Sequence, residues 1–275
     1  MMKLNIVPAR TGYAWFREGL RTFWRQPLAL AGLFFMFISV MSVASLVPVI
    51  GSALALALLP AATLGLMAAT REATQGHFPM PSILISAFRA GREQARAMGM
   101  LGLLYALAFL AVLGLSALID GGSFARLYLV GGSITRELVE SSEFRSAAWV
   151  AMALYLPLSL LFWHAPALVH WHGISPAKSL FFSAVACVRN FAALTVYALC
   201  WFGLAMAAFV VLMVITVGLG MPGLMATLML PTAMMLAAMF FSSFWFTFRD
   251  SFKAEEPGLR EQETVLPSDL PPPEA

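Results

Sequence analysis

The chain has 275 residues, of which 60% are hydrophobic and only 11% are charged, and its formal net charge at pH 7 is +3. A soluble domain carries about 25% charged residues, so this composition is too poor in charge to cover a water-facing surface. It excludes a soluble globular protein and predicts a single membrane domain over residues 1–253, with no nucleic-acid partner.

The segment ahead of the first apolar stretch predicts an amphipathic helix that lies in the membrane interface. Its apolar residues fall at helical spacing: Tyr13, Phe16, Leu20, Phe23 and Trp24. A stripe on another face is basic: Arg17, Arg21 and Arg25. Such a helix sits half sunk among anionic headgroups, so these arginines are candidate lipid contacts.

Two further segments of this kind follow Pro81 and Pro176. The one after Pro81 adds three candidate headgroup contacts: Arg89, Arg92 and Arg96. Each of the three segments is either a plain anchor beside the membrane or a lipid-sensing element.

Four stretches contain no Lys, Arg, Asp or Glu: 26–70, 97–119, 146–177 and 190–248. About 20 apolar helical residues cross the hydrocarbon core of a bilayer. The first and the last stretch are long enough for two crossings, and Pro48 and Pro222 lie where each would turn. The sequence therefore predicts an all-α bundle with six spans, at about 28–48, 52–70, 97–119, 147–169, 194–217 and 224–247.

The distribution of basic residues orients these spans. Of the 17 Lys and Arg residues, all but Arg126, Arg136 and Arg145 fall on the side of the N-terminus. Because basic residues concentrate on the cytoplasmic side, we expect both termini in the cytoplasm and loop 120–146 in the periplasm. The tail, 254–275, is acidic and rich in proline, which predicts disorder.

The order of elements suggests a threefold pseudo-repeat. Each unit has one interfacial helix, one plain span and one span with an internal proline, at Pro60, Pro157 and Pro231. The second span also carries a small residue at every fourth position: Ala53, Ala57, Ala61, Gly65 and Ala69. Small residues let membrane helices approach closely, so we place this span at the centre of the bundle. Either a helix of the same chain or a second copy fills the groove.

The segment FWHAPALVHWHG (162–173) holds the one titratable cluster within the apolar stretches. An ionisable residue inside a span is a functional candidate, so His164, with Trp163 and Pro166, is the predicted binding site. The structural alternative is a tryptophan–histidine belt at the membrane surface. Metal ligation would need further convergent ligands, which the neighbouring sequence does not supply. We therefore expect no metal.

Signatures of catalysis are missing from the sequence. It has no HExxH pair, no nucleophile elbow and no phosphate-cradling glycine loop. We therefore predict a protein that is not an enzyme, with no catalytic residue and no cofactor.

Four motifs resemble an uncharacterised family of six-span inner-membrane proteins of proteobacteria, best represented in beta-proteobacteria. They are RQPLALAGLFF (25–35), LPAATLGLMAAT (59–70), FWHAPALVHWHG (162–173) and FFSAVACVRN (181–190). The resemblance covers about residues 1–253 and implies a location in the bacterial inner membrane. It assigns no residue to catalysis or binding.

Two functions fit these features. The first is a non-catalytic protein that organises lipid, partner membrane proteins or copies of itself. The second is a permease or channel-like carrier for a neutral or amphipathic solute. A carrier needs a polar cavity, lined for example by Ser159, Thr63 or Thr232, whereas an organising protein would be packed solid.

Overall fold

The computed structural model describes residues 2–47, 50–221 and 223–254. Beyond Ala254, the predicted tail lies outside these residues. Six helical segments are long and apolar enough to span a membrane, which confirms the prediction of six spans. They are α2 (Pro27–Ser45), α3 (Ile50–Thr74), α5 (Arg92–Asp120), α8 (Ser142–Phe162) continued by α9 (Ala165–His172), α11 (Phe191–Gly218) and α12 (Gly223–Ser251).

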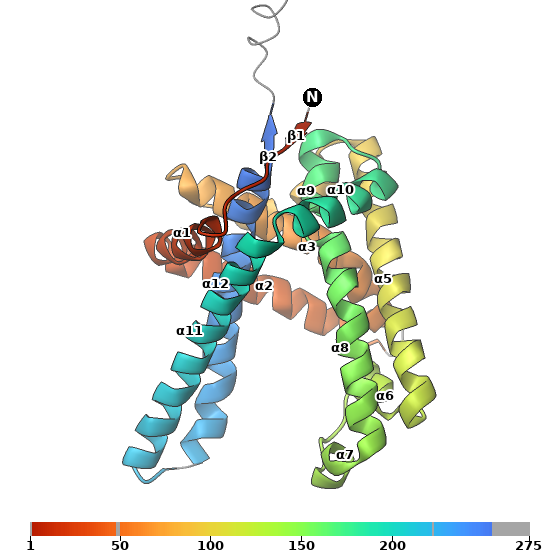
Figure 1. The fold of residues 1–275 in the computed structure, drawn as a ribbon, viewed down its shortest axis with the longest axis vertical. Helices are drawn as coiled ribbons and strands as arrows, with labels where there is room; N and C mark the ends of the chain where they lie inside the picture. The colour runs from red at the N-terminus through yellow and green to blue at the C-terminus, as the bar shows by residue number, and fades with distance from the viewer. Residues whose placement is uncertain (1, 48–49, 222, 255–275) are drawn as a thin grey trace, which may run out of the picture.

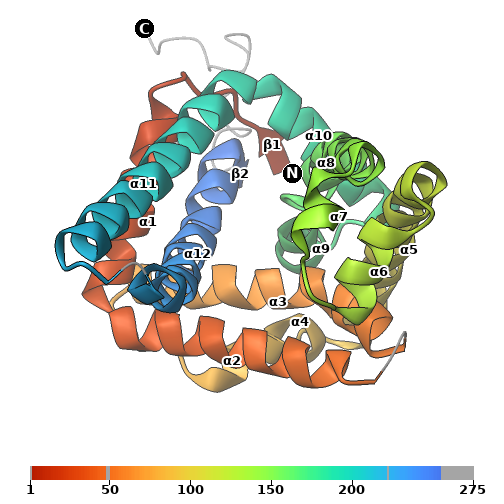
Figure 2. The same ribbon diagram turned by 90° about the horizontal axis from the view of Figure 1, so that it is seen from below.

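The spans form three hairpins, α2–α3, α5–α8 and α11–α12. The α11–α12 hairpin descends on one side of the molecule and α5 and α8 on the other (Figure 1). Seen from below, α2 and α3 run across between these two groups (Figure 2). Pro60, Pro157 and Pro231 each lie inside the second helix of a hairpin, as the repeat predicts. Two short helices connect α5 to α8: α6 (Ser123–Val130) and α7 (Arg136–Glu140).

Two hydrophobic cores share α3. One joins α3 with α5, α8, α9 and the end of α12, and the other joins α3 with α1 (Thr11–Arg25), α2, α11 and α12, so α12 also contributes to both. Of the 18 most hydrophobic consecutive residues of α3, 56% are buried, against 39% in α5 and 33% in α2. The second span therefore is the central helix.

Helix α1 packs on protein more than the sequence indicates. Trp15 and Phe23 are both 0% exposed, and the Trp15 Nε1–H donates a hydrogen bond to Asp250 Oδ2 (2.9 Å). Phe23, which the sequence places among lipid headgroups, therefore lies in the protein core. Tyr13 and Trp24 are 54% and 63% exposed, so they remain on the outer face of the helix.

The second interfacial segment is shorter than its sequence pattern. It consists of the 3₁₀ helix η1 (Pro81–Ile85) and one turn of α-helix, α4 (Ser86–Arg89). Gly91 then turns the chain with φ +120°, a conformation that L side chains rarely adopt. Arg92 and Arg96 consequently lie on the first turns of α5. The third segment forms one helix, α10 (Pro176–Arg189).

The two ends of the described chain are held together. Strand β1 (Met2–Leu4) pairs antiparallel with β2 (Phe252–Ala254). Beside them, the buried Asn190 accepts a hydrogen bond from the Val7 N–H (2.8 Å) and donates one to the Asn5 C=O (3.1 Å). We call this arrangement the terminal clasp.

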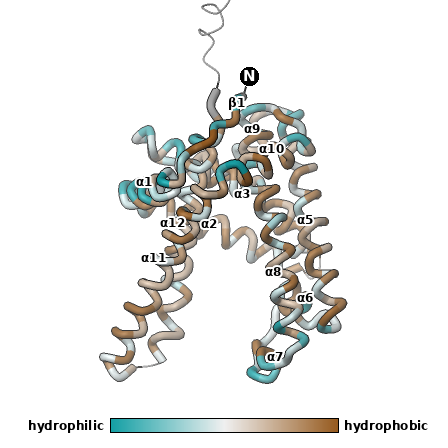
Figure 3. Tube along the Cα trace, in the orientation of Figure 1, coloured by the Kyte–Doolittle hydropathy of each residue, from teal (hydrophilic) through white to brown (hydrophobic). Residues whose placement is uncertain are grey.

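Hydrophilic residues gather at the two ends of the molecule. Figure 3 shows them at α1 and near α9 and α10 at one end, and at α7 at the other. Hydrophobic residues predominate along the long helices between these ends (Figure 3). This distribution is the one that a bilayer requires.

Candidate functional site

The predicted binding segment lies at a break in the fourth span. Helix α8 ends at Phe162 and α9 begins at Ala165, with Pro166 in its first turn. In an unbroken helix, the N–H of His164 would bond directly to the C=O of Leu160. Here the hydroxyl of Ser183, from α10, lies between them: it accepts from the His164 N–H (2.9 Å) and donates to the Leu160 C=O (2.8 Å). An inserted side chain and a proline are recognised causes of such a kink.

The side chains at this break face α12. The Trp163 Nε1–H donates to Thr247 Oγ1 (3.1 Å), and its ring stacks on Phe244 with centroids 4.6 Å apart. His164 is 1% exposed, and its ring centroid lies 6.1 Å from that of Phe248 in α12 and 5.4 Å from that of Phe252 in β2. The Nδ1 atom of His164 has no hydrogen-bond partner among the described residues. The structure thus brings the predicted site residues together, as a joint between the fourth and the sixth span.

His170 and His172 lie on α9, the short helix beyond this joint. No group of three or more His, Cys, Asp or Glu side chains within the described part of the chain is arranged to hold a metal ion.

The small-residue groove of α3 is occupied by the same chain. A Cβ added to Gly102 of α5 would overlap the carbonyl of Ala57. One added to Gly65 would lie 2.7 Å from the Cα of Leu84, in η1. Ala61 and Ala69 are buried, whereas Ala53 is half-buried. Helix α5 and η1 therefore approach α3 closely at Ala57 and Gly65.

The six predicted headgroup contacts are all exposed: Arg17, Arg21, Arg25, Arg89, Arg92 and Arg96. They come from three separate elements: α1, α4 and the start of α5.

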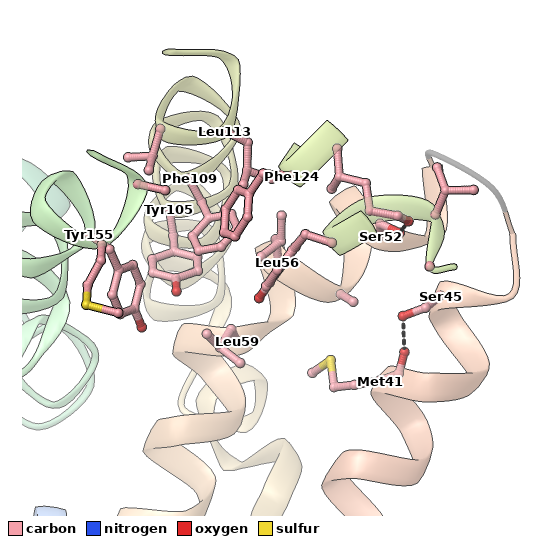
Figure 4. Close-up of a pocket in the computed structure, with 18 of the residues that line it drawn as sticks. Met41, Ser45, Ser52, Leu56, Leu59, Tyr105, Phe109, Leu113, Phe124 and Tyr155 are labelled. Atoms are coloured by element: carbon pink, nitrogen blue, oxygen red, sulfur yellow. Dashed lines mark hydrogen bonds between the residues drawn. The ribbon is translucent and has the colours of Figure 1, made fainter. Parts of the chain in front are cut away.

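The structure also contains a cavity that was not anticipated from the sequence. It has a volume of about 830 Å³ and lies between α2, α3, α5, α6 and α8. Figure 4 shows Phe109 and Tyr105 of α5 facing it, with Tyr155 of α8 beside them. Phe109 contacts three tyrosine rings, with centroid distances of 6.0 Å to Tyr105, 5.1 Å to Tyr128 and 5.9 Å to Tyr155.

The cavity carries hydroxyl groups and no charge. None of the described residues that line it is Asp, Glu, Lys, Arg or His. Two serines also line it, but their hydroxyls already donate to backbone carbonyls: Ser52 to the Leu129 C=O of α6 (2.9 Å) and Ser45 to the Met41 C=O of its own helix (2.7 Å). The tyrosine hydroxyls are therefore its remaining polar groups. The chain has 5 Tyr, of which three meet here, but they come from three separate helices, so no local motif reveals the site.

Together, the six apolar helices and an uncharged cavity among them define a multi-pass α-helical membrane protein. The chain is 42% identical over 260 residues to a curated protein of Burkholderia thailandensis that is named as a probable inner membrane protein. The match covers 94% of this chain and 96% of that protein. The chain belongs to the family of this inner membrane protein. No family model matches the chain, and no solved structure matches it.

Proposed function

We propose that this inner membrane protein is non-catalytic and organises the membrane by binding lipid, with the cavity of Figure 4 as the site for an apolar or amphipathic chain. The observation that carries this proposal is the uncharged lining of a space of about 830 Å³. Charged groups inside a bilayer are costly and serve charged substrates, whereas an apolar lining suits an acyl chain. The tyrosine hydroxyls can satisfy a single ester or hydroxyl group of the ligand.

The exposed arginines support the same role at the membrane surface. A basic residue near an anionic leaflet contributes about 1 kcal/mol to membrane attraction. With both termini in the cytoplasm, the six arginines would face the anionic lipids of the inner leaflet. The organising function would then combine a headgroup contact at one surface with a chain-binding cavity among the helices.

Native mass spectrometry of the detergent-purified protein tests the cavity. Ala148 lines it on α8, so Ala148→Phe should fill part of the space and reduce the lipid that the protein retains. Ala153→Phe is the matched control, because this exposed alanine lies on the same helix and does not line the cavity. Equal lipid retention by both variants and the wild type would contradict the proposal.

The second candidate function is a carrier for an amphipathic solute. It is favoured by the internal prolines Pro60, Pro157 and Pro231, because a proline leaves one backbone carbonyl of a membrane helix without its usual donor. The polar residues that such a path would need lie elsewhere, however. Thr63 and Ser159 bond to carbonyls of their own helices, at Leu59 and Leu156, and neither lines the cavity. Solute flux in proteoliposomes that disappears in Ala148→Phe would favour the carrier.

A further inference from the structure

A second cavity lies at the end of the molecule that carries the termini. It has a volume of about 480 Å³ and is formed where the end of α3 meets η1, α4 and α9. Its polar lining comes from all four elements: Glu72 of α3, Ser82 of η1, Ser86 and Arg89 of α4, and His170 of α9. The volume falls within the range of ligand sites, about 300–1,000 Å³. It is separate from the cavity of Figure 4, with which it shares no lining residue.

Two polar atoms of this second cavity are buried and lack partners. Ser86 Oγ and His170 Nδ1 have no hydrogen-bond partner among the described residues. Buried polar side-chain atoms in native proteins are nearly always bonded to protein or to a bound molecule. Ser86 and His170 come from different elements and both line this cavity, so a single ligand that turns the two side chains toward it could satisfy both atoms.

The charges that line the cavity have opposite signs. Arg89 contributes a guanidinium group and Glu72 a carboxylate, which also accepts a hydrogen bond from His77 Nδ1 when that atom is protonated (3.1 Å). A purely anionic ligand would be repelled by Glu72, and a purely cationic ligand by Arg89. A ligand that carries both charges is complementary to the lining.

Apolar side chains border the polar groups. Phe78 and Met80 line the cavity and are 64% and 65% exposed. Exposed apolar side chains beside a charged site, at the polar end of a membrane helix, suit a ligand whose headgroup continues into hydrocarbon.

We propose that this cavity binds a phosphoethanolamine group, as found in the headgroup of phosphatidylethanolamine. The phosphate accepts hydrogen bonds from the Arg89 guanidinium, the Ser86 hydroxyl and the His170 ring in its Nδ1–H tautomer. The ammonium group binds the Glu72 carboxylate. Arg71 continues the basic surface beside the cavity, with its guanidinium 5.8 Å from the Trp171 ring centroid and 5.6 Å from that of Trp245.

Lipid titration of the purified full-length protein, followed by native mass spectrometry, tests the site. The probes are phosphatidylethanolamine, phosphatidylglycerol, soluble phosphoethanolamine and inorganic phosphate. Wild type should prefer phosphatidylethanolamine to phosphatidylglycerol. Arg89→Gln should weaken phosphatidylethanolamine binding about tenfold, the effect of losing one charge-assisted bond. Arg189→Gln is the matched control, because this arginine is exposed on α10, does not line the cavity and is not one of the six predicted headgroup contacts.

Glu72→Gln gives a result that partial unfolding would not produce. It should reverse the preference toward phosphatidylglycerol, because it removes the carboxylate that repels an anion. Equally tight binding of soluble phosphoethanolamine and of phosphatidylethanolamine would identify a free solute as the ligand, and binding of the diacyl lipid alone would identify a membrane headgroup. An unchanged lipid preference in Glu72→Gln, or equal loss in Arg89→Gln and Arg189→Gln, would overturn the proposal. Ala148→Phe should leave this preference intact, so failure of this site and failure of the Figure 4 cavity are distinguishable.

Discussion

The Ser183 hydroxyl accepts a hydrogen bond from the backbone N–H of His164, 2.9 Å away. Ser183 lies on α10, so a side chain from another helix supplies the bond that is missing at the break between α8 and α9. The same hydroxyl donates to the Leu160 C=O, so one side chain satisfies both backbone groups that the break separates. These two bonds hold α10 to the fourth span.

Ser183→Ala should therefore destabilise the protein by about 1–3 kcal/mol, because the buried His164 N–H loses its partner and the Leu160 C=O keeps only the weak Cys187 thiol (3.7 Å). Thermal unfolding in detergent measures the effect. Ser179→Ala is the matched control: Ser179 is also buried in α10, but its hydroxyl bonds only to the Pro176 C=O of its own helix. Equal melting temperatures for the two variants would show that the bridge contributes nothing to stability.

Two glycines set the distance of α1 from the last hairpin. A Cβ on Gly12 would overlap the Ala193 carbonyl, and one on Gly19 would overlap the side chain of Ser243. Gly19→Ala should cost about 1–3 kcal/mol, because the two helices must separate. Gly203→Ala, on α11, meets no atom within 4 Å and should be neutral or slightly stabilising. Detergent melting curves compare the two variants, and a neutral Gly19→Ala would contradict the close packing.

The Cys187 thiol should be inert in the folded protein. Burial raises its pKa to about 12, so at pH 8 only about one thiol in ten thousand is ionised to the reactive thiolate. In a Cys200→Ala background, a maleimide should modify Cys187 only after unfolding. Val188→Cys, with both native cysteines replaced, is the exposed comparison on the same helix. Equal labelling rates at these two positions would refute the buried placement.

The orientation of the chain is open to a direct test. Gln75 and Glu137 are both exposed and lie on opposite sides of the predicted membrane domain. If the basic surface faces the cytoplasm, Glu137→Cys in a cysteine-free background should react with an impermeant thiol reagent added to whole cells with a permeable outer membrane. Gln75→Cys should react only after the inner membrane is opened. The reverse pattern would place the termini in the periplasm.

The six spans are predictable from the sequence because they depend on local composition. Charge-free stretches fix the number of helices, and each helix need only be apolar and long enough. Pro166 likewise indicates a helix break near the fourth span. The partner that completes the break, Ser183, is not predictable, since it is distant in sequence and resembles any other serine.

Contacts between distant elements account for the remaining differences. The buried face of α1 cannot be distinguished from a lipid-facing one by its pattern, because protein and lipid both accept apolar side chains. Only the structure shows that Trp15 and Phe23 belong to the core. The cavity of Figure 4 escapes prediction for the same reason: its tyrosines come from three helices and share no spacing.

The terminal clasp fixes an order of assembly. Val7 bonds to Asn190, 183 positions later in the chain, and α1 packs on α11 and α12. At about 5–20 residues per second, ribosomal synthesis separates these partners by roughly 10 to 40 s. During that interval α11 and α12 have not yet left the ribosome. The face of α1 that carries Trp15 and Phe23 therefore cannot yet make its contacts with them. The first helix to be made is therefore among the last to reach its final place, and the arrival of the third hairpin closes the fold.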